Sequence, residues 1–465
     1  MWCQWLPGGF GLSVPKFYHV KLLLRGVQDQ LAPGPPGVGG SLSREAILTR
    51  CPWGGGGLSW LPAEHEARMA ARLEELGSIG RRGRGLWRFP FTPDYEQATT
   101  LVGGWMRQAG LEVSRDPIGN LIGRASGSSD RVVATGSHLD TVRDGGRFDG
   151  ALGVVGAISA ASFLLAEYGR PRKTLEVIAY TGEEGARFPV CLLGSRWMAG
   201  LITPEDLLSA DPDGVTLASA LASLGQSNAV PPAAGRTDLD AFIELHTEQG
   251  PVLEAAGSSL GVVDRIMGQC EVEVTVRGRP DHAGTTPMAM RSDALVAAAK
   301  LILAMRAEVL GWSSPTVFTV GRLTVKPGSG NVVPAEVTFS IDLRDPDPDF
   351  YRRSRERLRD MCRGAAAADK VVVTWRDLFT TDPVACDPGL SEILSRAATK
   401  LGHRPITLPS GAGHDSMVLA GLTRVGLLFV PSAGGRSHCP EEHTPSQQCY
   451  LGAAVLAEAL RELAY

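Results

Sequence analysis

The sequence predicts an α/β fold with a mixed, largely parallel sheet covered by helices and an inserted ferredoxin-like domain. Short apolar runs at 131–135 and 174–181 flank a helical pattern at 151–168, and this β-α-β order is typical of parallel strands. The strict alternation of Glu271-Val-Glu-Val-Thr-Val-Arg277 then marks a change of pattern. At 465 residues the chain is also too long for one ordinary core, which favours two domains.

The first sixty residues differ in composition from the remainder of the chain. They are rich in Gly, Pro and Trp and contain a run of glycines at 54–57. Such a segment buries too little apolar surface to offset the chain entropy that is lost on ordering. Residues 1–60 are therefore predicted to be a disordered or poorly packed N-terminal extension.

From residue 64 onward, the spacing of apolar residues predicts the elements of the α/β part in turn. A first helix begins after Glu64, and a second runs over 94–109, where Gly110 ends it. Further helices are predicted at 151–168 and 250–256. Strands are predicted at both ends of 113–124 and at 131–135, 174–181 and 241–245.

A second set of elements follows in the order β-α-β-β-α-β, which is typical of a ferredoxin-like sandwich. The predicted strands lie at 271–277, 316–325, 335–343 and 370–375, and the predicted helices lie at 292–309 and 349–363. The α/β pattern then resumes with a helix at 391–401 and a strand at 425–430. The ferredoxin-like part is therefore expected to be an insertion.

Charge and composition exclude several classes of partner. The 46 basic and 50 acidic residues leave a net charge of −4, without a block of like charge to bind nucleic acid or a membrane surface. No run approaches the roughly 18 apolar residues of a membrane span, and the N-terminus lacks the features of a secretory signal. The eight cysteines form no C-x-x-C pair. We expect a cytoplasmic protein with reduced thiols that acts on a small molecule.

Ligand-type side chains follow the predicted strands at four places, as in a metal hydrolase. The candidates are His138 with Asp149, the adjacent Glu183 and Glu184, His246, and His438. Because neighbouring side chains diverge, one glutamate can bind metal while the other faces the substrate as general base. Taken singly, each candidate has an ordinary alternative, such as a solvated loop residue or a buried core histidine. Asp140 is placed to take the second ring N–H of His138 and fix its tautomer.

From about Glu64 to its C-terminus, the chain resembles the dinuclear-metal amidohydrolases. This family includes N-carbamoyl-L-amino-acid hydrolase, allantoate amidohydrolase and ureidoglycolate amidohydrolase, and it is related to aminoacylases and carboxypeptidase-G type peptidases. The resemblance rests on several motifs in the family's order: Gly136-Ser-His-Leu-Asp-Thr-Val142, Phe148-Asp-Gly150, Glu183-Glu-Gly185, Leu245-His-Thr-Glu-Gln-Gly-Pro251, His282-Ala-Gly-Thr-Thr-Pro287 and Ser410-Gly-Ala-Gly-His-Asp415. Thr247 stands where the family usually has a bulkier aliphatic residue.

The resemblance implies two divalent metal ions, zinc foremost, with manganese, cobalt or nickel as alternatives. It implies that Asp149 bridges the ions and that the other ligands are His138 and His246 for one ion and Glu184 and His438 for the other. Glu183 would deprotonate the metal-bridging water and pass the proton to the leaving amine. His443, close after His438, ranks lower as a ligand.

The resemblance also assigns substrate contacts to the inserted part. His282, Asn331 and Arg344 match positions that contact substrate, and His282 would polarise the scissile carbonyl. Arg344 suits bidentate capture of a carboxylate, although an ion pair with Asp342 or Asp345 is the alternative.

The implied domain arrangement combines these assignments. Residues 61–267 and 380–465 would form a discontinuous metal-binding catalytic domain, and 268–379 an inserted lid and dimerisation domain. Some substrate-binding groups would reach the partner subunit's site, so a homodimer is implied. Gln249 and His414 are further expected substrate contacts.

The expected activity is hydrolysis of the carbamoyl C–N bond of an N-carbamoyl-L-amino acid or a related ureido acid, with carbon dioxide and ammonia as products. Allantoate or ureidoglycolate is the strongest alternative substrate. An aminoacylase or peptidase, and a metal-free binding protein of the same fold, are less favoured.

Overall fold

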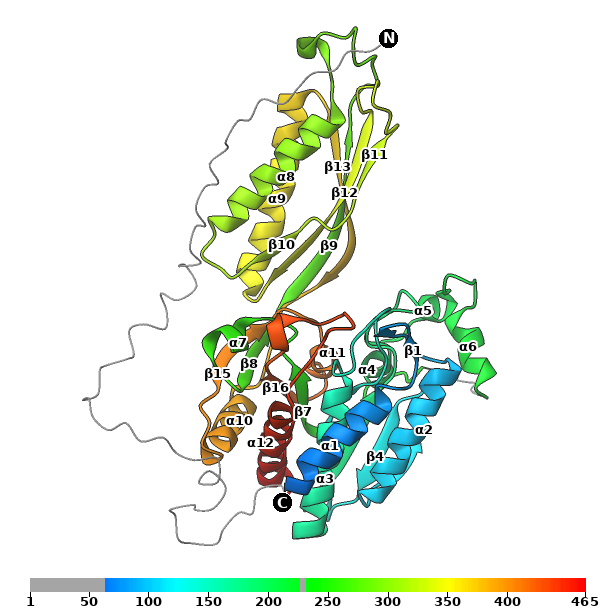
Figure 1. Cartoon of the computed structure of the whole chain (residues 1–465), viewed down its shortest axis with the longest axis vertical. Coiled ribbons are helices and arrows are strands. Elements are labelled where there is room, and N and C mark those ends of the chain that lie inside the picture. Colours follow the sequence, from blue (N-terminus) through cyan, green and yellow to red (C-terminus); the bar gives the residue numbers. More distant parts are fainter. Residues whose placement is uncertain (1–62, 226–230) are drawn as a thin grey trace, which may run out of the picture. The chain divides into compact units, whose positions relative to one another are not determined.

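The computed structural model describes residues 63–225 and 231–465, whose helices and strands are drawn in Figure 1. The predicted N-terminal extension, 1–60, lies outside these residues. The described strands form a nine-stranded sheet, a five-stranded sheet and a two-stranded ribbon of β1 (Arg81–Arg82) and β2 (Gly85–Leu86).

The nine-stranded sheet has a parallel centre. Its four central strands, in spatial order, are β16 (Arg424–Val430), β7 (Leu239–Thr247), β5 (Ser129–His138) and β6 (Lys173–Tyr180), and all run parallel. The outer strands are β3 (Glu112–Arg115), β4 (Leu121–Ala125), β8 (Gly261–Ile266), β14 (Val384–Ala385) and β15 (Ile406–Ser410). Most outer pairings are antiparallel, while β15 runs parallel to β8. The predicted α/β class with a mixed, largely parallel sheet is confirmed.

One long apolar helix, α3 (Ala151–Tyr168), forms the centre of the larger core. It packs against α1 (Ala63–Leu76), α12 (Ser446–Ala464) and the central strands, as Figure 1 shows. Its length and composition would suffice to cross a membrane, but most of its residues are buried in this core. A Cβ at Gly153 would lie 2.2 Å from the carbonyl oxygen of Leu245, so glycine permits the close helix–sheet approach.

The remaining helices of this part cover the sheet or its loops. They are α2 (Pro93–Gln108), α4 (Leu193–Met198), α5 (Pro204–Leu208), α6 (Leu217–Ser223), α7 (Val252–Ala256), α10 (Pro388–Lys400), α11 (Asp415–Leu419) and the 3₁₀ turn η3 (Ala433–Gly435). The start of α2 agrees with its sequence, because the Thr92 hydroxyl accepts the backbone N–H of Tyr95 and Pro93 occupies the first turn.

The second sheet is antiparallel and has the order β10-β12-β9-β13, with β11 also paired to β12. Its strands are β9 (Gly268–Arg277), β10 (Val317–Thr319), β11 (Leu323–Lys326), β12 (Glu336–Asp345) and β13 (Val372–Thr381). Helices α8 (Ala294–Leu310) and α9 (Pro348–Asp369) pack on it around a separate core, and η2 (Met288–Met290) precedes α8. The chain order matches β-α-β-β-α-β, but the strand predicted at 316–325 is divided in two between β10 and β11.

Several elements had no counterpart in the sequence prediction. Strands β8, β14 and β15 and helices α11 and α12 were not expected. Helix α12 is buried on nearly all sides, so it lacks the polar face by which surface helices are recognised. The pairing of β8 with β15 joins segments on either side of the insertion, which no local pattern can indicate.

Candidate metal centre

Candidate ligands meet at one edge of the nine-stranded sheet. Because β16, β7, β5 and β6 run parallel, their carboxyl ends lie together. His138 is the last residue of β5, and His246 is the next to last of β7. Glu183 and Glu184 follow β6, and His438 lies in the loop after β16. The parallel topology thus brings together the residues expected from the ends of these strands.

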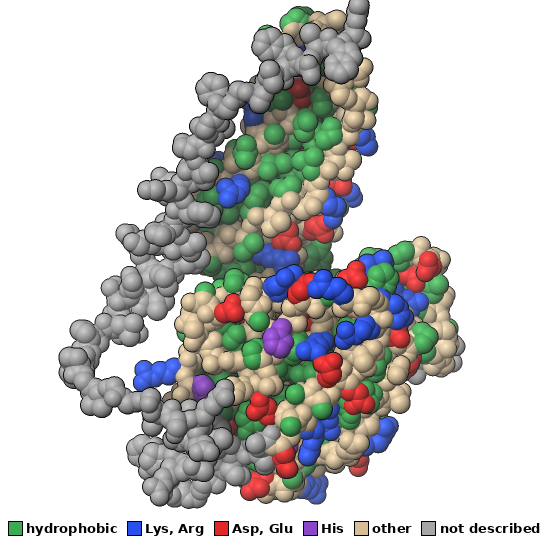
Figure 2. Space-filling model, viewed as in Figure 1, with side chains coloured by type: hydrophobic (Ala, Val, Ile, Leu, Met, Phe, Trp, Pro, Cys, Tyr) green, Lys and Arg blue, Asp and Glu red, His purple; other side chains and the backbone are tan. Residues whose placement is uncertain are grey.

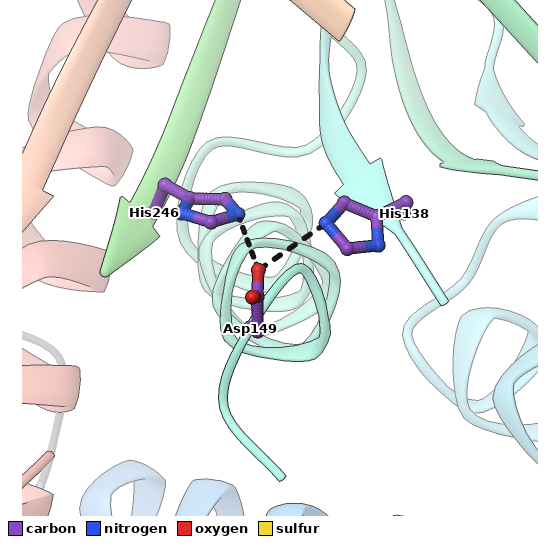
Figure 3. Close-up of side chains that lie close together, drawn as sticks. All are labelled: His138, Asp149 and His246. Carbon is purple, nitrogen blue, oxygen red and sulfur yellow. Dashed lines mark ion pairs between the residues drawn. The ribbon is translucent and has the colours of Figure 1, made fainter. Parts of the chain in front are cut away.

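Asp149 lies between two imidazoles, as Figure 3 shows. Its Oδ1 is 3.2 Å from Nε2 of His246 and 3.4 Å from Nε2 of His138, and both rings are buried. No aligned hydrogen-bond donor reaches Oδ1 from the described residues. Gly150 makes the close approach possible, since its φ is +63° and a Cβ there would lie 2.5 Å from the His138 ring.

Backbone carbonyls orient both imidazoles. Nδ1 of His138 lies 3.0 Å from the backbone carbonyl oxygen of Asp140, and Nδ1 of His246 lies 2.9 Å from the backbone carbonyl oxygen of Thr247. A carbonyl oxygen can only accept, so each Nδ1 carries a proton and each Nε2 faces Asp149, where it can bind an ion once it has no proton of its own. This is the tautomer that a metal-ligating histidine needs. Nε2 of His246 also accepts the backbone N–H of Gly150 at 3.2 Å.

A second group of donors uses the other oxygen of Asp149. Nε2 of His438 lies 3.2 Å from Asp149 Oδ2 and 3.5 Å from Glu184 Oε1. Glu184 Oε1 is buried and has no hydrogen-bond donor among the described residues. In each of the two groups, His138–Asp149–His246 and Asp149–Glu184–His438, the candidate atoms lie within 4.8 Å of one another. Buried carboxylate oxygens without donors, beside imidazole nitrogens, fit a divalent metal ion.

Burial and crowding perturb the carboxyl groups of this cluster. Burial raises the pKa of Glu183 well above its usual range, and the adjacent Glu184 carboxylate adds to the shift. Burial also raises the pKa of Glu184, to about 7, with the charge of Asp149 contributing. Burial opposes ionisation of Asp149 too, but its contacts with His138, His246 and His438 hold its pKa well below the usual range. The charges of this cluster thus favour the ionised form of Asp149, whereas burial favours the protonated forms of Glu183 and Glu184.

Asp140 orients His138 as expected, but with its backbone carbonyl and not with its carboxylate, whose Oδ1 is 3.9 Å from Nδ1 of His138. The second ring N–H of His138 goes to the Asp140 backbone, while the Asp140 carboxylate accepts three backbone N–H groups. These come from Gly182 at 2.8 Å, Glu183 at 3.1 Å and Glu184 at 3.1 Å. Asp140 thus holds the loop of the two glutamates as well as turning the His138 ring.

Gln249 lies inside the cluster. Its Nε2 donates to Asp149 Oδ2 at 2.9 Å, and its Oε1 is buried without a donor among the described residues. Its φ of +59° is unusual for a residue with a side chain, and its backbone N–H donates to Ser432 Oγ at 3.0 Å. The side chain is therefore aimed at the bridging position by a constrained backbone.

Two other histidines near these strand ends, His414 and His443, do not join the Asp149 groups. His414 is only 2 % exposed, its Nε2 lies 2.8 Å from Ser410 Oγ, and its ring packs edge-on against His246 with centroids 4.7 Å apart. His414 therefore packs behind a candidate ligand, and its expected substrate contact stays a prediction. His443 is exposed and packs against Phe148, which agrees with its lower rank as a ligand.

The expected substrate contacts of the second sheet are also described. His282 is exposed, its Nδ1 accepts the backbone N–H of Gly284 at 3.0 Å, and Ala283 N–H donates to the Asn331 carbonyl at 2.9 Å. Arg344 makes two hydrogen bonds to the Asp342 carboxylate, at 2.9 and 2.8 Å, which is the alternative named for it. Within the described ranges, no contact joins the His282, Asn331 or Arg344 side chains to the Asp149 cluster.

Sequence reasoning missed the buried acids around the cluster. Glu442 is 5 % exposed and accepts the backbone N–H groups of Phe148 and Asp149. Glu244 accepts the hydroxyls of Ser137 and Ser416, at 2.8 and 2.7 Å. The one sequence signal for these residues is that each lies close to a strand-end motif, because a single Glu in a sequence does not indicate whether it is buried.

The chain is similar to a known peptidase family and, in sequence and fold, to known amidohydrolases and amidases. The family model described as peptidase family M20/M25/M40 matches residues 134–462. The chain is 41 % identical over 401 residues to an N-carbamoyl-L-amino-acid amidohydrolase of Paenarthrobacter aurescens, covering 85 % of this chain and 97 % of that protein. It is 37 % identical over 399 residues to an allantoate amidohydrolase of Bacillus subtilis, covering 84 % and 96 %. A solved amidase of the hydantoinase/carbamoylase family from Burkholderia multivorans superposes with a TM-score of 0.81 at 35 % identity, covering 86 % and 98 %.

Proposed function

The chain belongs to the peptidase family M20/M25/M40, and from this premise we propose that it hydrolyses the carbamoyl C–N bond of an N-carbamoyl-L-amino acid or a related ureido acid. It is a hydrolase of carbon–nitrogen bonds other than peptide bonds, as its amidohydrolase relatives are. The observation that carries the proposal is the pair of ligand groups that share Asp149, with Glu183, whose side chain is 11 % exposed, beside them.

The centre is proposed to hold two divalent ions, zinc foremost, with manganese, cobalt or nickel as alternatives. Asp149 would bridge them, with His138 and His246 on one ion and Glu184 and His438 on the other. Asp149 Oδ1 and Glu184 Oε1, which accept no hydrogen bond from the described residues, support this assignment. Such ions, when bound, activate water and polarise the carbonyl that it attacks.

Glu183 is the proposed general base. Its Oε2 lies 4.0 Å from His138 Nε2, and it belongs to neither of the groups that share Asp149. A carboxyl group whose pKa is raised by burial matches a task that requires taking and returning a proton near neutral pH. Glu183 would accept the proton of the attacking water and deliver it to the nitrogen that leaves as the C–N bond breaks.

Four side chains are proposed to bind the substrate. Gln249 keeps a buried amide oxygen without a donor, which suits a ureido N–H. His282 would polarise the scissile carbonyl, with Asn331 beside it. Arg344 would bind the carboxylate, for which it must exchange its present partners, the Asp342 carboxylate and the Gly411 carbonyl. His414 is proposed instead to support the His246 ring.

The part of the chain over 268–379 is proposed to serve as lid and dimerisation domain of a homodimer. Helix α8 presents Val296, Leu303 and Leu310, which are 45 %, 67 % and 67 % exposed, at seven-residue spacing on one face. Figure 2 shows hydrophobic side chains gathered over this helix. An exposed apolar stripe of this kind is typical of helix–helix association.

A reducing compartment, the cytoplasm, is proposed for the protein. All six cysteines among the described residues are free thiols, which agrees with a compartment that keeps thiols reduced.

Ammonia release identifies the substrate class. The full chain, supplied with zinc, manganese or cobalt, is assayed for ammonia with N-carbamoyl-L-amino acids, allantoate and ureidoglycolate. With N-acetyl amino acids and dipeptides, whose hydrolysis releases no ammonia, the free amino acid is measured instead. We expect turnover of at least one ureido compound and none of the N-acyl compounds or peptides. Absence of turnover with every ureido compound would reject the proposal, whereas preference for allantoate would select the alternative substrate.

A further inference from the structure

We infer that Glu442 is a positioning residue, which fixes the backbone of Asp149 and ties it to the loop that carries His438. The inference rests on the proposed metal function, because Glu442 would set the spacing between Asp149 and His438, two proposed ligands of one ion. Glu442 belongs to none of the candidate ligand groups.

Glu442 joins two segments that are far apart in the chain. Its Oε2 accepts the backbone N–H of Phe148 at 2.8 Å and of Asp149 at 3.2 Å, and its Oε1 accepts the hydroxyl of Ser437 at 2.7 Å. Ser437 immediately precedes His438. One carboxylate therefore holds the Asp149 backbone and the residue next to the His438 ligand.

The loop before Asp149 is shaped around this carboxylate. A Cβ at Gly146 would lie 2.1 Å from Glu442 Oε2, so the backbone approaches to a distance that only glycine allows. Glycines at 145, 146 and 150 also make the loop flexible in isolation. The hydrogen bonds to Glu442 supply the restraint that this glycine-rich segment lacks.

Glu442 and the adjacent Glu441 differ in the charged groups that surround them. Glu441 forms ordinary ion pairs with Arg84 and Arg436. Among the described residues, Glu442 forms no ion pair with a Lys or Arg, and its charge is met by two amides and one hydroxyl. A buried anion of this kind costs free energy unless something compensates it, and two cations at Asp149 would do so.

Ser437 extends the restraint to the bridging carboxylate. Its Oγ lies 2.7 Å from Glu442 Oε1 and 3.2 Å from Asp149 Oδ2. A hydroxyl has one proton to donate, and the shorter distance assigns it to Glu442 Oε1. Glu442 is thereby bonded to the Asp149 backbone directly and holds Ser437 Oγ beside the Asp149 carboxylate.

The test compares Glu442→Ala, Glu442→Gln and the control Glu441→Ala in the full chain. Zinc affinity and stoichiometry are measured by titration with a chelating indicator, and the geometry by the visible spectrum of the cobalt-loaded protein. We expect about 10- to 100-fold weaker binding of one of two ions for Glu442→Ala, as for other residues that orient ligands. Glu442→Gln should show a smaller loss and an altered cobalt spectrum, while Glu441→Ala should match the wild type in both.

A second readout separates positioning from general stability. We expect the rise in melting temperature on zinc addition to shrink in Glu442→Gln, with kcat reduced and KM nearly unchanged. Equal lowering of the melting temperatures with and without zinc, at unchanged zinc affinity, would overturn the inference. If Glu442→Ala does not fold, Glu442→Gln carries the test alone. A wild type that binds no metal would reject the proposed function itself, whereas unchanged metal binding in both Glu442 variants rejects this inference only.

Discussion

The carboxylate of Asp140 accepts the backbone N–H of Glu184 at 3.1 Å, and with it the amides of Gly182 and Glu183. One buried acid thus fixes the loop that carries both the proposed base and a proposed ligand. The same loop packs two carboxylates side by side, so its conformation sets how far apart they lie.

Replacing Asp140 by Asn is expected to lower kcat by about 10- to 100-fold. The amide offers one acceptor oxygen where the carboxylate offers two, so the Glu183–Glu184 loop loses part of its support. Steady-state kinetics measure the effect. Asp144→Asn is the control and should keep nearly full activity, because Asp144 lies in the same loop as Asp140 but its carboxylate accepts the indole N–H of Trp87. Equal kcat in both variants would contradict the role given to Asp140.

Replacing Glu183 by Gln should abolish most activity and leave the metal content intact. Loss of a general base removes about 10²- to 10⁴-fold in rate, and the amide preserves the shape of the side chain. Activity assays combined with elemental analysis of the purified variant measure the outcome. Loss of metal from Glu183→Gln would mean that the roles of Glu183 and Glu184 are exchanged.

Metal content should distinguish the bridging residue from a terminal one. Asp149→Asn is expected to lose both ions, because Asp149 contacts both histidine groups. His438→Ala should retain one, held by His138, Asp149 and His246. Elemental analysis after dialysis against metal-free buffer decides this, with the exposed His443→Ala as control. Equal metal content in all three variants would reject the assignment.

Metal affinity should rise with pH from about 6 to 9. Contact with Asp149 raises the pKa of His438 to about 9, and burial raises that of Glu184 to about 7. Both must lose a proton before they can bind a cation, so protons compete with the metal below these values. Zinc titrations at several pH values measure the dissociation constant. A constant value across this range would show that neither group is a ligand.

Leu303→Glu should convert the proposed homodimer to a monomer, because it places a charge in the apolar stripe of α8. Light scattering coupled to gel filtration measures the mass. Glu308→Gln, on the same helix and paired with Arg357, should leave the dimer intact. A wild type that is monomeric at micromolar concentration would reject the dimer.

The sequence alone determined the fold class and the residues that meet at the sheet edge. His138, Glu183, Glu184 and His246 lie at or just after strands whose apolar runs are readable locally, and parallel strands end at a common edge. The motifs at these strand ends therefore predict the cluster around Asp149.

Tertiary structure decided which polar groups are buried and what they contact. Glu441 and Glu442 are adjacent and chemically identical. Glu441 nevertheless forms ion pairs with two arginines, whereas Glu442 accepts the backbone N–H of Asp149. Asp140 turned out to hold the glutamate loop, and His414 proved to pack behind His246. These outcomes depend on segments up to hundreds of residues apart, and local periodicity carries no information about which of two neighbouring side chains the folded chain encloses.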